Sequence, residues 1–294
     1  MTDMLIVGAG PAGLTAAIYA RRAGLSVTVF DKVVYGGQAA ITPEIENYPA
    51  IDRITGPEFA QRLYDQAVGL GADIRFEEVR SLRLTGDIKI ARTGSGTYEA
   101  RTVILAHGVR RRKLGCLGEE ELLGKGVSYC ATCDGAFFRG KDVAVVGGGN
   151  TALEDALYLA ELCRSVTIIH RRASFKGEKP LVAAVAERPS IRKLMGYEVE
   201  RIEGEKEVHA LLLRGQDGEE RLRWPVHGVF IAIGYEPDNA WLEGQVELDP
   251  QGYILSDESC TTALEGVYVA GDNRRKPLRQ IVTAASDGAV AAHQ

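Results

Sequence analysis

The sequence lacks the features that mark a nucleic-acid binder, a secreted protein or a membrane protein. Its formal net charge is −5, whereas proteins that bind a polyanion usually gather Lys and Arg on one face. We therefore expect the basic run at residues 110–113 to be a solvated turn. No apolar run approaches the roughly 20 residues that a membrane-spanning helix needs. Because an apolar strand pattern starts at Met4, we expect no secretory leader and a cytoplasmic location.

Cysteine is also scarce. The chain has five cysteines, an odd number, and only Cys130 and Cys133 lie close together. A framework of structural disulfides is therefore not expected. The pair could be half of a zinc site, but zinc needs two further Cys or His ligands at suitable spacing, and Cys116, Cys163 and Cys260 are isolated. We expect these three to be small buried apolar residues, and the close pair to be redox-active.

The chain does contain one structural plan twice, namely strand, glycine turn, helix and strand. The first copy occupies residues 5–31 and the second occupies residues 143–169. Each copy is followed by alternating charged and apolar residues, 74–99 and 197–223, which are typical of antiparallel strands. An apolar strand that ends in a small-x-Gly turn follows in each half. The plan predicts an α/β fold with two Rossmann-like nucleotide-binding domains, each with a small antiparallel β element.

Residues 259–294 do not fit this tandem plan. They hold a further apolar strand at residues 266–270, then Gly271-Asp272 and a helix of small residues, but no third glycine fingerprint. We expect the segment to complete one of the two domains, and the pattern leaves open which one. Crossings between the domains are expected near residues 112–116 and 236–239.

The first glycine turn has the spacing of a dinucleotide-binding fingerprint. Gly8 and Gly10 suit a tight turn and the close approach of the backbone to a pyrophosphate, and Gly13 suits close packing of the helix. Asp31 ends the following strand, where a carboxylate can accept hydrogen bonds from ribose hydroxyls. The alternative is a tight strand–helix turn that binds nothing.

The second glycine turn, at residues 147–152, has the same context but a different ending. Its second strand runs into His170-Arg171-Arg172 and has no acidic residue there. A carboxylate at this place would repel a ribose 2′-phosphate, whereas guanidinium groups bind it with charge-assisted hydrogen bonds. The pattern predicts NADPH rather than NADH at this site. The alternative is a solvated basic loop.

The most specific local signal is the Cys130-Ala131-Thr132-Cys133 sequence. Two thiols at this spacing can close a small disulfide and keep one thiolate reactive near neutral pH. Asp134 follows directly and could shuttle protons during exchange, although a plain turn residue before Gly135 is an equal alternative. A flavin is the usual relay between a nicotinamide and a disulfide. Two nucleotide sites and one dithiol therefore indicate FAD at the turn with Asp31 and NADPH at the other.

Together these residues resemble the low-molecular-weight thioredoxin reductases over residues 4–294. The specific part is residues 130–135, placed just ahead of the second glycine turn and followed by residues 170–172. Other segments are similar to flavin-contacting elements of that family, and these are residues 36–38, 46–49, 270–272 and 279–280.

The resemblance implies a discontinuous FAD-binding domain of residues 1–112 and 238–294. An NADPH-binding domain of residues 113–237, which carries the dithiol, is then inserted between its two parts. The resemblance also implies a homodimer that transfers electrons from NADPH to the disulfide of thioredoxin. The NADPH domain rotates in that family, so that either the dithiol or the nicotinamide meets the flavin.

The resemblance also assigns roles to single residues. Cys130 attacks the thioredoxin disulfide, Cys133 is the thiol nearest the flavin, and Asp134 is the acid/base. Asp272 contacts the ribityl chain. The cofactor-binding residues expected from the motifs and the resemblance are Gly8, Gly10, Pro11, Ala12, Gly13, Asp31, Gly37, Gln38, Asn47, Ala106, Gly108, Gly271, Asp272, Arg279, Gln280, Gly147, Gly149, Asn150, Thr151, Ala152, His170, Arg171, Arg172 and Lys176.

Two residues depart from the family pattern. His107 stands where the family usually has Thr in an Ala-Thr-Gly turn, so packing or hydrogen bonding near the FAD is expected to differ. Lys176 stands where an Arg commonly completes the 2′-phosphate clamp. Its charge is kept but the planar fork is lost, so the NADPH preference is expected to be weaker.

Two alternatives stay open from the sequence. A relative with the same flavin and dithiol could use another donor or acceptor, such as ferredoxin, a peroxiredoxin system or oxygen. The intact Gly147 and Gly149, with Arg171 and Arg172, count against ferredoxin. From a different class, the chain could be a non-catalytic flavin-binding module, but a cysteine pair beside a nucleotide fingerprint argues against this.

Overall fold

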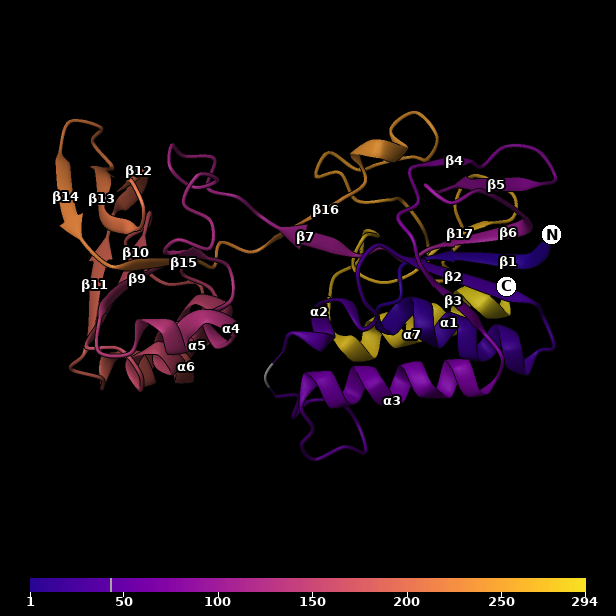
Figure 1. Cartoon of the computed structure of the whole chain (residues 1–294), viewed down its shortest axis with the longest axis horizontal. Coiled ribbons are helices and arrows are strands. Elements are labelled where there is room, and N and C mark those ends of the chain that lie inside the picture. Colours follow the sequence, from indigo (N-terminus) through magenta and orange to yellow (C-terminus); the bar gives the residue numbers. More distant parts are fainter. Residues whose placement is uncertain (43) are drawn as a thin grey trace. The chain divides into compact units, whose positions relative to one another are not determined.

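The computed structural model describes residues 1–42 and 44–294, and the chain divides into two compact units (Figure 1). Unit 1 consists of Met1–Arg110 and Glu236–Gln294, and unit 2 consists of Arg111–Tyr235. Strands β7 (Val109–Arg111) and β16 (Tyr235–Pro237) lie where the chain passes from one unit to the other. These two strands pair with each other.

The expectation of a turn at residues 110–113 is wrong, because Arg110 and Arg111 belong to strand β7. The Arg110 guanidinium forms ion pairs with Glu236 at 3.0 Å and with Asp238 at 3.2 Å. These acidic partners follow Arg110 by more than a hundred residues, so the local sequence gave no sign of them.

Unit 1 is built on a seven-stranded sheet in the order β3-β2-β1-β6-β5-β4, with β17 also paired to β6. Strands β1, β2, β3, β6 and β17 form parallel pairs, whereas β4, β5 and the first half of β6 are antiparallel. The strands are β1 (Thr2–Val7), β2 (Val27–Asp31), β3 (Asp73–Phe76), β4 (Ser81–Arg83), β5 (Lys89–Arg92), β6 (Thr97–Leu105) and β17 (Val267–Val269).

The prediction of antiparallel strands at residues 74–99 is wrong for its first part. Strand β3 runs parallel to β2, because helix α3 (Gly56–Gly69) lies between them in the sequence and returns the chain to the same end of the sheet. Thr55 caps this helix by accepting a hydrogen bond from the Glu58 N–H. The remaining strands, β4 to β6, form the expected antiparallel element.

Residues 259–294 complete unit 1. Strand β17 pairs with β6, and helix α7 (Ile281–His293) packs on helix α1 (Pro11–Arg22). The two helices approach so closely that a Cβ on Gly288 would lie 2.1 Å from the carbonyl oxygen of Ala12. The small residues of the last helix are therefore needed for this contact.

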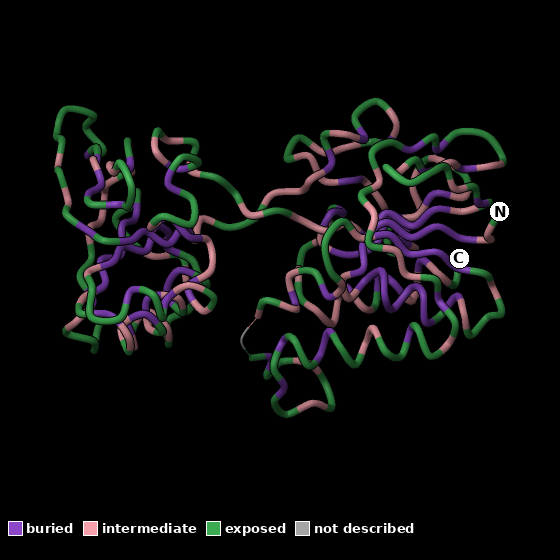
Figure 2. The backbone as a smooth tube through the Cα atoms, viewed as in Figure 1, coloured by how far each residue is buried: buried purple, intermediate pink, exposed green. Residues whose placement is uncertain are grey.

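The side chains of the central strand alternate between two cores, as expected for a sheet covered on both faces. Met4 and Ile6 pack with helix α1, whereas Leu5 and Val7 pack with residues of β4, β5 and the segment 242–254. Helices α1, α3 and α7 cover one face of the sheet (Figure 1). Strands β1 and β2 and the last residues of β6 are buried along most of their length (Figure 2).

Unit 2 contains a five-stranded parallel sheet in the order β11-β10-β9-β15-β8 and a separate antiparallel sheet. The parallel strands are β8 (Val127–Ser128), β9 (Asp142–Val146), β10 (Ser165–His170), β11 (Ile191–Met195) and β15 (Gly228–Ile231). The antiparallel strands are β12 (Tyr197–Gly204), β13 (Val208–Gly215) and β14 (Arg221–Pro225), as predicted for residues 197–223.

Three α-helices lie in unit 2, in the sequence between these strands. They are α4 (Ala131–Asp134), α5 (Asn150–Ala160) and α6 (Lys179–Ala186). Short 3-10 turns occur at η1 (Gly135–Phe138) in this unit and η2 (Ala240–Leu242) in unit 1. Unit 1 also has the short helix α2 (Gly37–Ala40). In residues 1–42 and 44–294, no helix combines the length and apolar character needed to cross a bilayer.

Candidate functional site

The first glycine turn lies at the carboxyl ends of β1 and β6. Gly8 has a φ of +108°, and a Cβ there would lie 2.3 Å from the carbonyl oxygen of Ala106. A Cβ on Gly13 would lie 1.8 Å from the Gly8 carbonyl oxygen. Asp31 Oδ2 accepts a hydrogen bond from the Ala9 N–H at 2.8 Å. The turn is held against the sheet, and the Asp31 carboxylate keeps lone pairs for further donors.

Helix α1 begins directly behind this turn. Gly10 is its N-cap residue and Pro11 stands in its first turn, and no side chain caps the free N–H groups. Such a helix start attracts anions. Gly37 lies against Gly10, since a Cβ on Gly37 would come within 3.3 Å of the Gly10 Cα. The backbone of Gly10 and of Gly37 is therefore accessible only because neither residue has a side chain.

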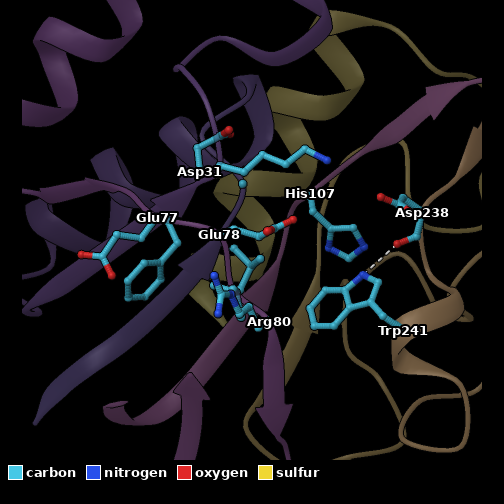
Figure 3. A pocket seen from close by; sticks show the side chains of 12 residues that line it. Asp31, Glu77, Glu78, Arg80, His107, Asp238 and Trp241 are labelled. Carbon is cyan, nitrogen blue, oxygen red and sulfur yellow. Dashed lines mark hydrogen bonds between the residues drawn. The ribbon is translucent and has the colours of Figure 1, made fainter. Parts of the chain in front are cut away.

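A cavity of about 470 Å³ adjoins the first turn, and all of its lining residues belong to unit 1. Asp31 and Glu78 contribute to one part of its wall, and His107 and Trp241 contribute to another (Figure 3). A volume of this size is typical of small-molecule sites. The lining residues are Val7, Gly8, Phe30, Asp31, Lys32, Glu77, Glu78, Val79, Arg80, His107, Asp238 and Trp241.

His107, between Ala106 and Gly108, is the centre of a buried hydrogen-bond network that the sequence did not reveal. Its Nε2 lies 2.7 Å from Asn239 Oδ1, which can only accept, so Nε2 carries the proton. Its Nδ1 then accepts from Asn273 at 3.4 Å. Burial lowers the pKa of His107, so the ring is neutral at pH 7.

The His107 ring also packs edge-on against the Trp241 indole, with 5.5 Å between the ring centroids (Figure 3). The Trp241 Nε1–H donates to the Asp238 carbonyl oxygen at 2.8 Å. A threonine side chain has no ring and could not make both ring contacts, so the expectation that hydrogen bonding differs at His107 stays a prediction. Its partner Asn239 lies over a hundred residues away, so no sequence signal joined them.

The residues expected to contact a flavin include two buried oxygens that find no hydrogen-bond partner among the described residues. These are Gln38 Oε1 and Asp272 Oδ1, and the second of them also lies 3.8 Å from the Lys276 ammonium in an ion pair. Burial raises the pKa of Asp272. Unpaired buried polar atoms are costly and point to an additional partner, which fits residues that receive hydrogen bonds from a cofactor.

Three further predicted residues take part in contacts within unit 1. Asn47 donates to Gln280 Oε1 at 3.1 Å, which joins two segments that are distant in the sequence. Gln280 is also the N-cap of α7. The Arg279 guanidinium stacks on the Tyr253 ring at 3.9 Å from its centroid and donates to the Asp272 carbonyl oxygen.

A buried charge network supports the turn at Gly271 and Asp272, and the sequence reading missed it. The Asp287 carboxylate accepts hydrogen bonds from the Gly271 N–H, from Arg274 and from Lys276. Burial alone would raise the pKa of Asp287, but the hydrogen bonds from Arg274 and Lys276 outweigh it and lower the pKa. The small residues around Asp287 in helix α7 were the only hint in the sequence that this carboxylate is buried.

The second glycine turn in unit 2 resembles the first but is closed differently. A Cβ on Gly147 would lie 2.2 Å from the carbonyl oxygen of Ala232, and a Cβ on Gly148 would lie 2.4 Å from the His170 imidazole. His170 is buried, and burial and Arg172 lower its pKa. A neutral imidazole thus packs on the turn where the first turn has a carboxylate. The N-cap of helix α5 is Gly149, without a capping side chain.

The predicted phosphate-binding side chains differ in exposure. Thr151, Arg171 and Arg172 are exposed, whereas Ala152 is buried under the helix. Asn150 is engaged in a two-way contact with Glu178, as its Nδ2 donates to Glu178 Oε1 and its Oδ1 accepts from the Glu178 N–H, both at 2.8 Å.

Lys176 is joined to the second turn through its backbone. Its N–H donates to the Gly148 carbonyl oxygen at 2.7 Å. Lys176, Arg171 and Arg172 together form a cluster of basic side chains near His170 at the second turn. Glu178, which the sequence reading did not single out, holds the Lys176 loop to the helix start through Asn150.

Cys130 and Cys133 form a disulfide, with 5.3 Å between their Cα atoms. Cys130 is the N-cap of helix α4, and its Sγ accepts a hydrogen bond from the Cys133 N–H. The Asp134 carboxylate accepts a hydrogen bond from the hydroxyl of Ser128 at 2.6 Å. The structure therefore brings the pair together as predicted, and adds Ser128 as a partner of Asp134 that no sequence pattern indicated.

The isolated cysteines conform only partly to expectation. Cys163 and Cys260 are buried, but Cys116 is half-buried. Burial raises the pKa of each thiol to about 11, which keeps all three protonated and unreactive at neutral pH. Within residues 1–42 and 44–294, no three His, Cys, Asp or Glu side chains gather in a way that could hold a metal ion.

Comparison with known proteins defines the class of enzyme. The model of the pyridine nucleotide-disulphide oxidoreductase family matches residues 2–288. The chain belongs to this family and is an oxidoreductase. Proteins of this family use FAD and NADPH, which confirms the two cofactors predicted for the chain.

Within the family, the relatives are more specific. A thioredoxin reductase of Mycolicibacterium smegmatis is 45% identical over 291 residues, which cover 98% of this chain and 94% of the relative. A bifunctional thioredoxin reductase/thioredoxin of Mycobacterium leprae is 44% identical over 99% of this chain, and the chain spans 64% of the length of that relative.

A solved structure agrees with these relatives. The thioredoxin reductase of Lactococcus lactis is 36% identical, with a TM-score of 0.94 over 100% of this chain and 97% of its own. The resemblance to bacterial-type thioredoxin reductases and the α/β fold with two dinucleotide-binding domains are thereby confirmed.

Proposed function

We propose that this chain transfers two electrons from NADPH to the disulfide of thioredoxin through FAD and its own Cys130/Cys133 pair. The observation that carries the proposal is the Cys130–Cys133 disulfide, with Asp134 beside it, in a unit that also contains a dinucleotide-type glycine turn. A bound flavin supplies the relay between a hydride carrier and a disulfide. The names of the relatives support thioredoxin as the acceptor.

We assign FAD to unit 1, which consists of Met1–Arg110 and Glu236–Gln294; the expected bounds of this domain were residues 1–112 and 238–294. The uncapped start of α1 would hold its pyrophosphate, and Asp31 would accept hydrogen bonds from its ribose. The cavity beside the turn supports this assignment, because Asp31 and His107 line it from different parts of its wall. The buried oxygens of Gln38 and Asp272, for which the described residues supply no hydrogen bond, support placing the flavin end near these residues. A cofactor with several hydrogen-bond donors satisfies such atoms.

We assign NADPH to unit 2, expected as residues 113–237. The uncapped start of helix α5 at Gly149 would hold its phosphates, and Arg171, Arg172 and Lys176 would bind its 2′-phosphate. The exposure of both arginines supports this role. Because His170 is neutral and packs on Gly148, it shapes the turn and adds no charge to the phosphate site.

In the reaction with thioredoxin, the Cys130 thiolate attacks one sulfur of the partner disulfide, and a mixed disulfide forms as the partner's S–S bond breaks. The proton held by Asp134 passes to the departing sulfur. Cys133 then gives its proton to the Asp134 carboxylate and attacks Cys130, which releases the second partner thiolate. The exchange restores the Cys130–Cys133 disulfide and leaves two reduced sulfurs on thioredoxin once the second takes a proton from water.

We further propose that the enzyme acts as a homodimer in the cytoplasm. The location is supported by the chemistry of the reaction, because dithiol products persist in compartments where thiols are kept reduced. A dimer is supported only by the resemblance to the family. Sedimentation of the purified holoprotein tests it directly.

An anaerobic titration of the purified yellow protein tests the function. NADPH is added first, NADH is added to a second sample, and oxidised thioredoxin follows. We expect NADPH to bleach the flavin absorbance and thioredoxin to restore it. If dithionite bleaches the flavin but neither nucleotide does, the donor assignment is wrong. If thioredoxin does not restore the absorbance after bleaching, the acceptor assignment is wrong.

A further inference from the structure

Ser128 lies at the end of strand β8, two residues before the dithiol, and has only 4% of its surface exposed. Its hydroxyl has three polar neighbours. It lies 2.6 Å from Asp134 Oδ2, 3.0 Å from the Cys130 N and 3.2 Å from the Cys130 carbonyl oxygen. One buried hydroxyl therefore joins the candidate acid/base to the backbone of the attacking cysteine.

The chemistry of a hydroxyl makes this arrangement suitable for a carboxyl that changes protonation state. A serine hydroxyl donates one hydrogen bond and accepts two. When Asp134 is ionised, Ser128 accepts from the Cys130 N–H and donates to the carboxylate. When Asp134 is protonated, the carboxyl donates to Ser128 and the serine hydrogen turns to the Cys130 carbonyl oxygen. All groups stay paired in both states, without movement of a heavy atom.

A cavity of about 200 Å³ gives these two side chains access to solvent. Ser128 and Asp134 line it together with the exposed residues Lys141 and His227. All of these residues belong to unit 2. A proton on Asp134 can therefore exchange with water from this side, independently of the Cys130–Cys133 sulfurs.

We propose that Ser128 is a positioning residue that keeps Asp134 hydrogen-bonded in both of its protonation states during disulfide exchange. The proposal rests on the function assigned above, in which Asp134 gives a proton to the departing sulfur and takes one from Cys133. Each exchange thus returns Asp134 to its starting state, and Ser128 changes only the direction of its own hydrogen. Its loss affects the transfer between the dithiol and the acceptor and not the reduction of the flavin.

The test compares Ser128→Ala with Ser165→Ala in the holoenzyme. Ser165 is a matched control, because its hydroxyl donates to the Asp142 carboxylate at 2.7 Å in the same unit but outside this cavity. The prereduced enzyme is mixed with oxidised thioredoxin in a single turnover at pH values from 5 to 9. Flavin content and the rate of flavin bleaching by NADPH are measured in parallel.

For Ser128→Ala we expect normal flavin bleaching and a dithiol-exchange rate about tenfold lower at pH 7, the usual effect of losing a hydrogen bond to a charged group. Because the ionised carboxylate loses a donor, we expect the pH profile of the exchange in Ser128→Ala to differ from that of the wild type. Ser165→Ala is expected to keep the wild-type profile. An unchanged profile in Ser128→Ala, or the same shift in both variants, would overturn the proposal.

Two further variants separate positioning from a general structural effect. In an Asp134→Asn background, Ser128→Ala is expected to cause no further loss, because Ser128 acts through Asp134. An additive loss contradicts the proposal. If Ser128→Ala does not fold, Ser128→Thr replaces it, since it keeps the hydroxyl and is expected to keep the profile; a shifted profile in that variant counts against Ser128.

The failure of the proposed substrate can be recognised separately. If the wild-type enzyme reduces a small aromatic disulfide but not thioredoxin, the assigned partner is wrong. The same pH profiles are then measured with the small disulfide, and they still test Ser128. If Ser128→Ala keeps the wild-type pH profile with either acceptor, the positioning role of Ser128 is wrong, while the proposed function is unaffected.

Discussion

The two glycine turns share one backbone plan but present different chemistry. In unit 1 the second strand of the plan ends in Asp31, whose carboxylate accepts from the Ala9 N–H of the turn. In unit 2 the corresponding strand ends in His170, whose neutral ring packs on Gly148, with Arg171 and Arg172 exposed beyond it. In the proposed assignment, the residue at the end of the second strand distinguishes the two nucleotides, whereas both turns have the first two glycines of the fingerprint.

The sharpest difference between the units is that only unit 2 carries the dithiol, so its removal has the largest expected effect. Cys130→Ser and Cys133→Ser are each expected to reduce thioredoxin turnover to background, because one thiol cannot form the disulfide that ends the cycle. Bleaching of the flavin by NADPH is expected to persist in both. Turnover of a protein disulfide by either variant would contradict the mechanism. Cys163→Ser, at a buried and protonated thiol, is the control.

The third position of the turns also differs, since unit 1 has Gly13 where unit 2 has Ala152. In Gly13→Ala the new Cβ would lie 1.8 Å from the Gly8 carbonyl oxygen, so we expect a loss of about 3 kcal/mol in the stability of the apoprotein. Gly10→Ala is the matched variant, because no atom lies closer than 3.9 Å to its Cβ. We expect it to fold normally but to lose FAD. Urea unfolding and flavin content distinguish the two.

Unit 1 has a buried carboxylate, Asp287, and unit 2 has a half-buried one, Asp155, and their pKa values shift in opposite directions. Asp287 in unit 1 has a lowered pKa because of its hydrogen bonds from Arg274 and Lys276. Asp155 in unit 2 has its pKa raised to about 7, mainly by burial, although the charge of Arg111 opposes the shift.

The stability contributions of these two carboxylates therefore depend on pH with opposite signs. The contribution of Asp155 to the stability of the folded protein is fully present below about pH 4, where its carboxyl group is neutral. This contribution is lost as the pH rises through about 7. We expect Asp155→Asn to be more stable than the wild type at pH 8 by about 1–3 kcal/mol, with the difference vanishing near pH 4. Asp287→Asn is expected to be less stable at pH 7, with a difference that shrinks as the pH falls below 4. Thermal unfolding across this pH range measures both.

The smallest expected effect concerns the basic group of the second turn. Arg171→Ala and Arg172→Ala are each expected to raise the KM for NADPH about tenfold, through loss of a charge-assisted contact with the 2′-phosphate. The KM for NADH is expected to stay unchanged. Arg188→Ala, an exposed arginine paired with Glu161 in the same unit, is the control. Equal effects on both nucleotides would show that these arginines bind a part common to NADPH and NADH.

Local patterns predicted most of the fold. The glycine turns, the strands on either side of them and the three-stranded element at residues 197–223 were predicted correctly, because each depends on neighbours in the sequence. Strand β3 was assigned the wrong direction, because only the position of helix α3 makes it parallel to β2. The basic run at residues 110–113 was also misassigned, because its acidic partner Glu236 lies far away in the sequence.

In the candidate site, too, the residues that depend on near neighbours in the sequence were predicted and those that depend on distant contacts were not. Cys130, Cys133 and Asp134 were predicted because their chemistry depends on spacing along the chain. Ser128 was missed because a serine carries no signal of its own until its hydroxyl is placed 2.6 Å from a carboxylate.

The sequence by itself determined the two nucleotide-binding plans, the redox pair and the class of enzyme, since each is encoded within a few tens of residues. Only the tertiary structure decided that residues 259–294 complete unit 1, that Asn239 sets the His107 tautomer, and that Arg274 and Lys276 surround Asp287. The physical reason is that a hydrogen bond or a buried charge depends on distance in space. Folding alone brings such partners together from distant parts of the chain.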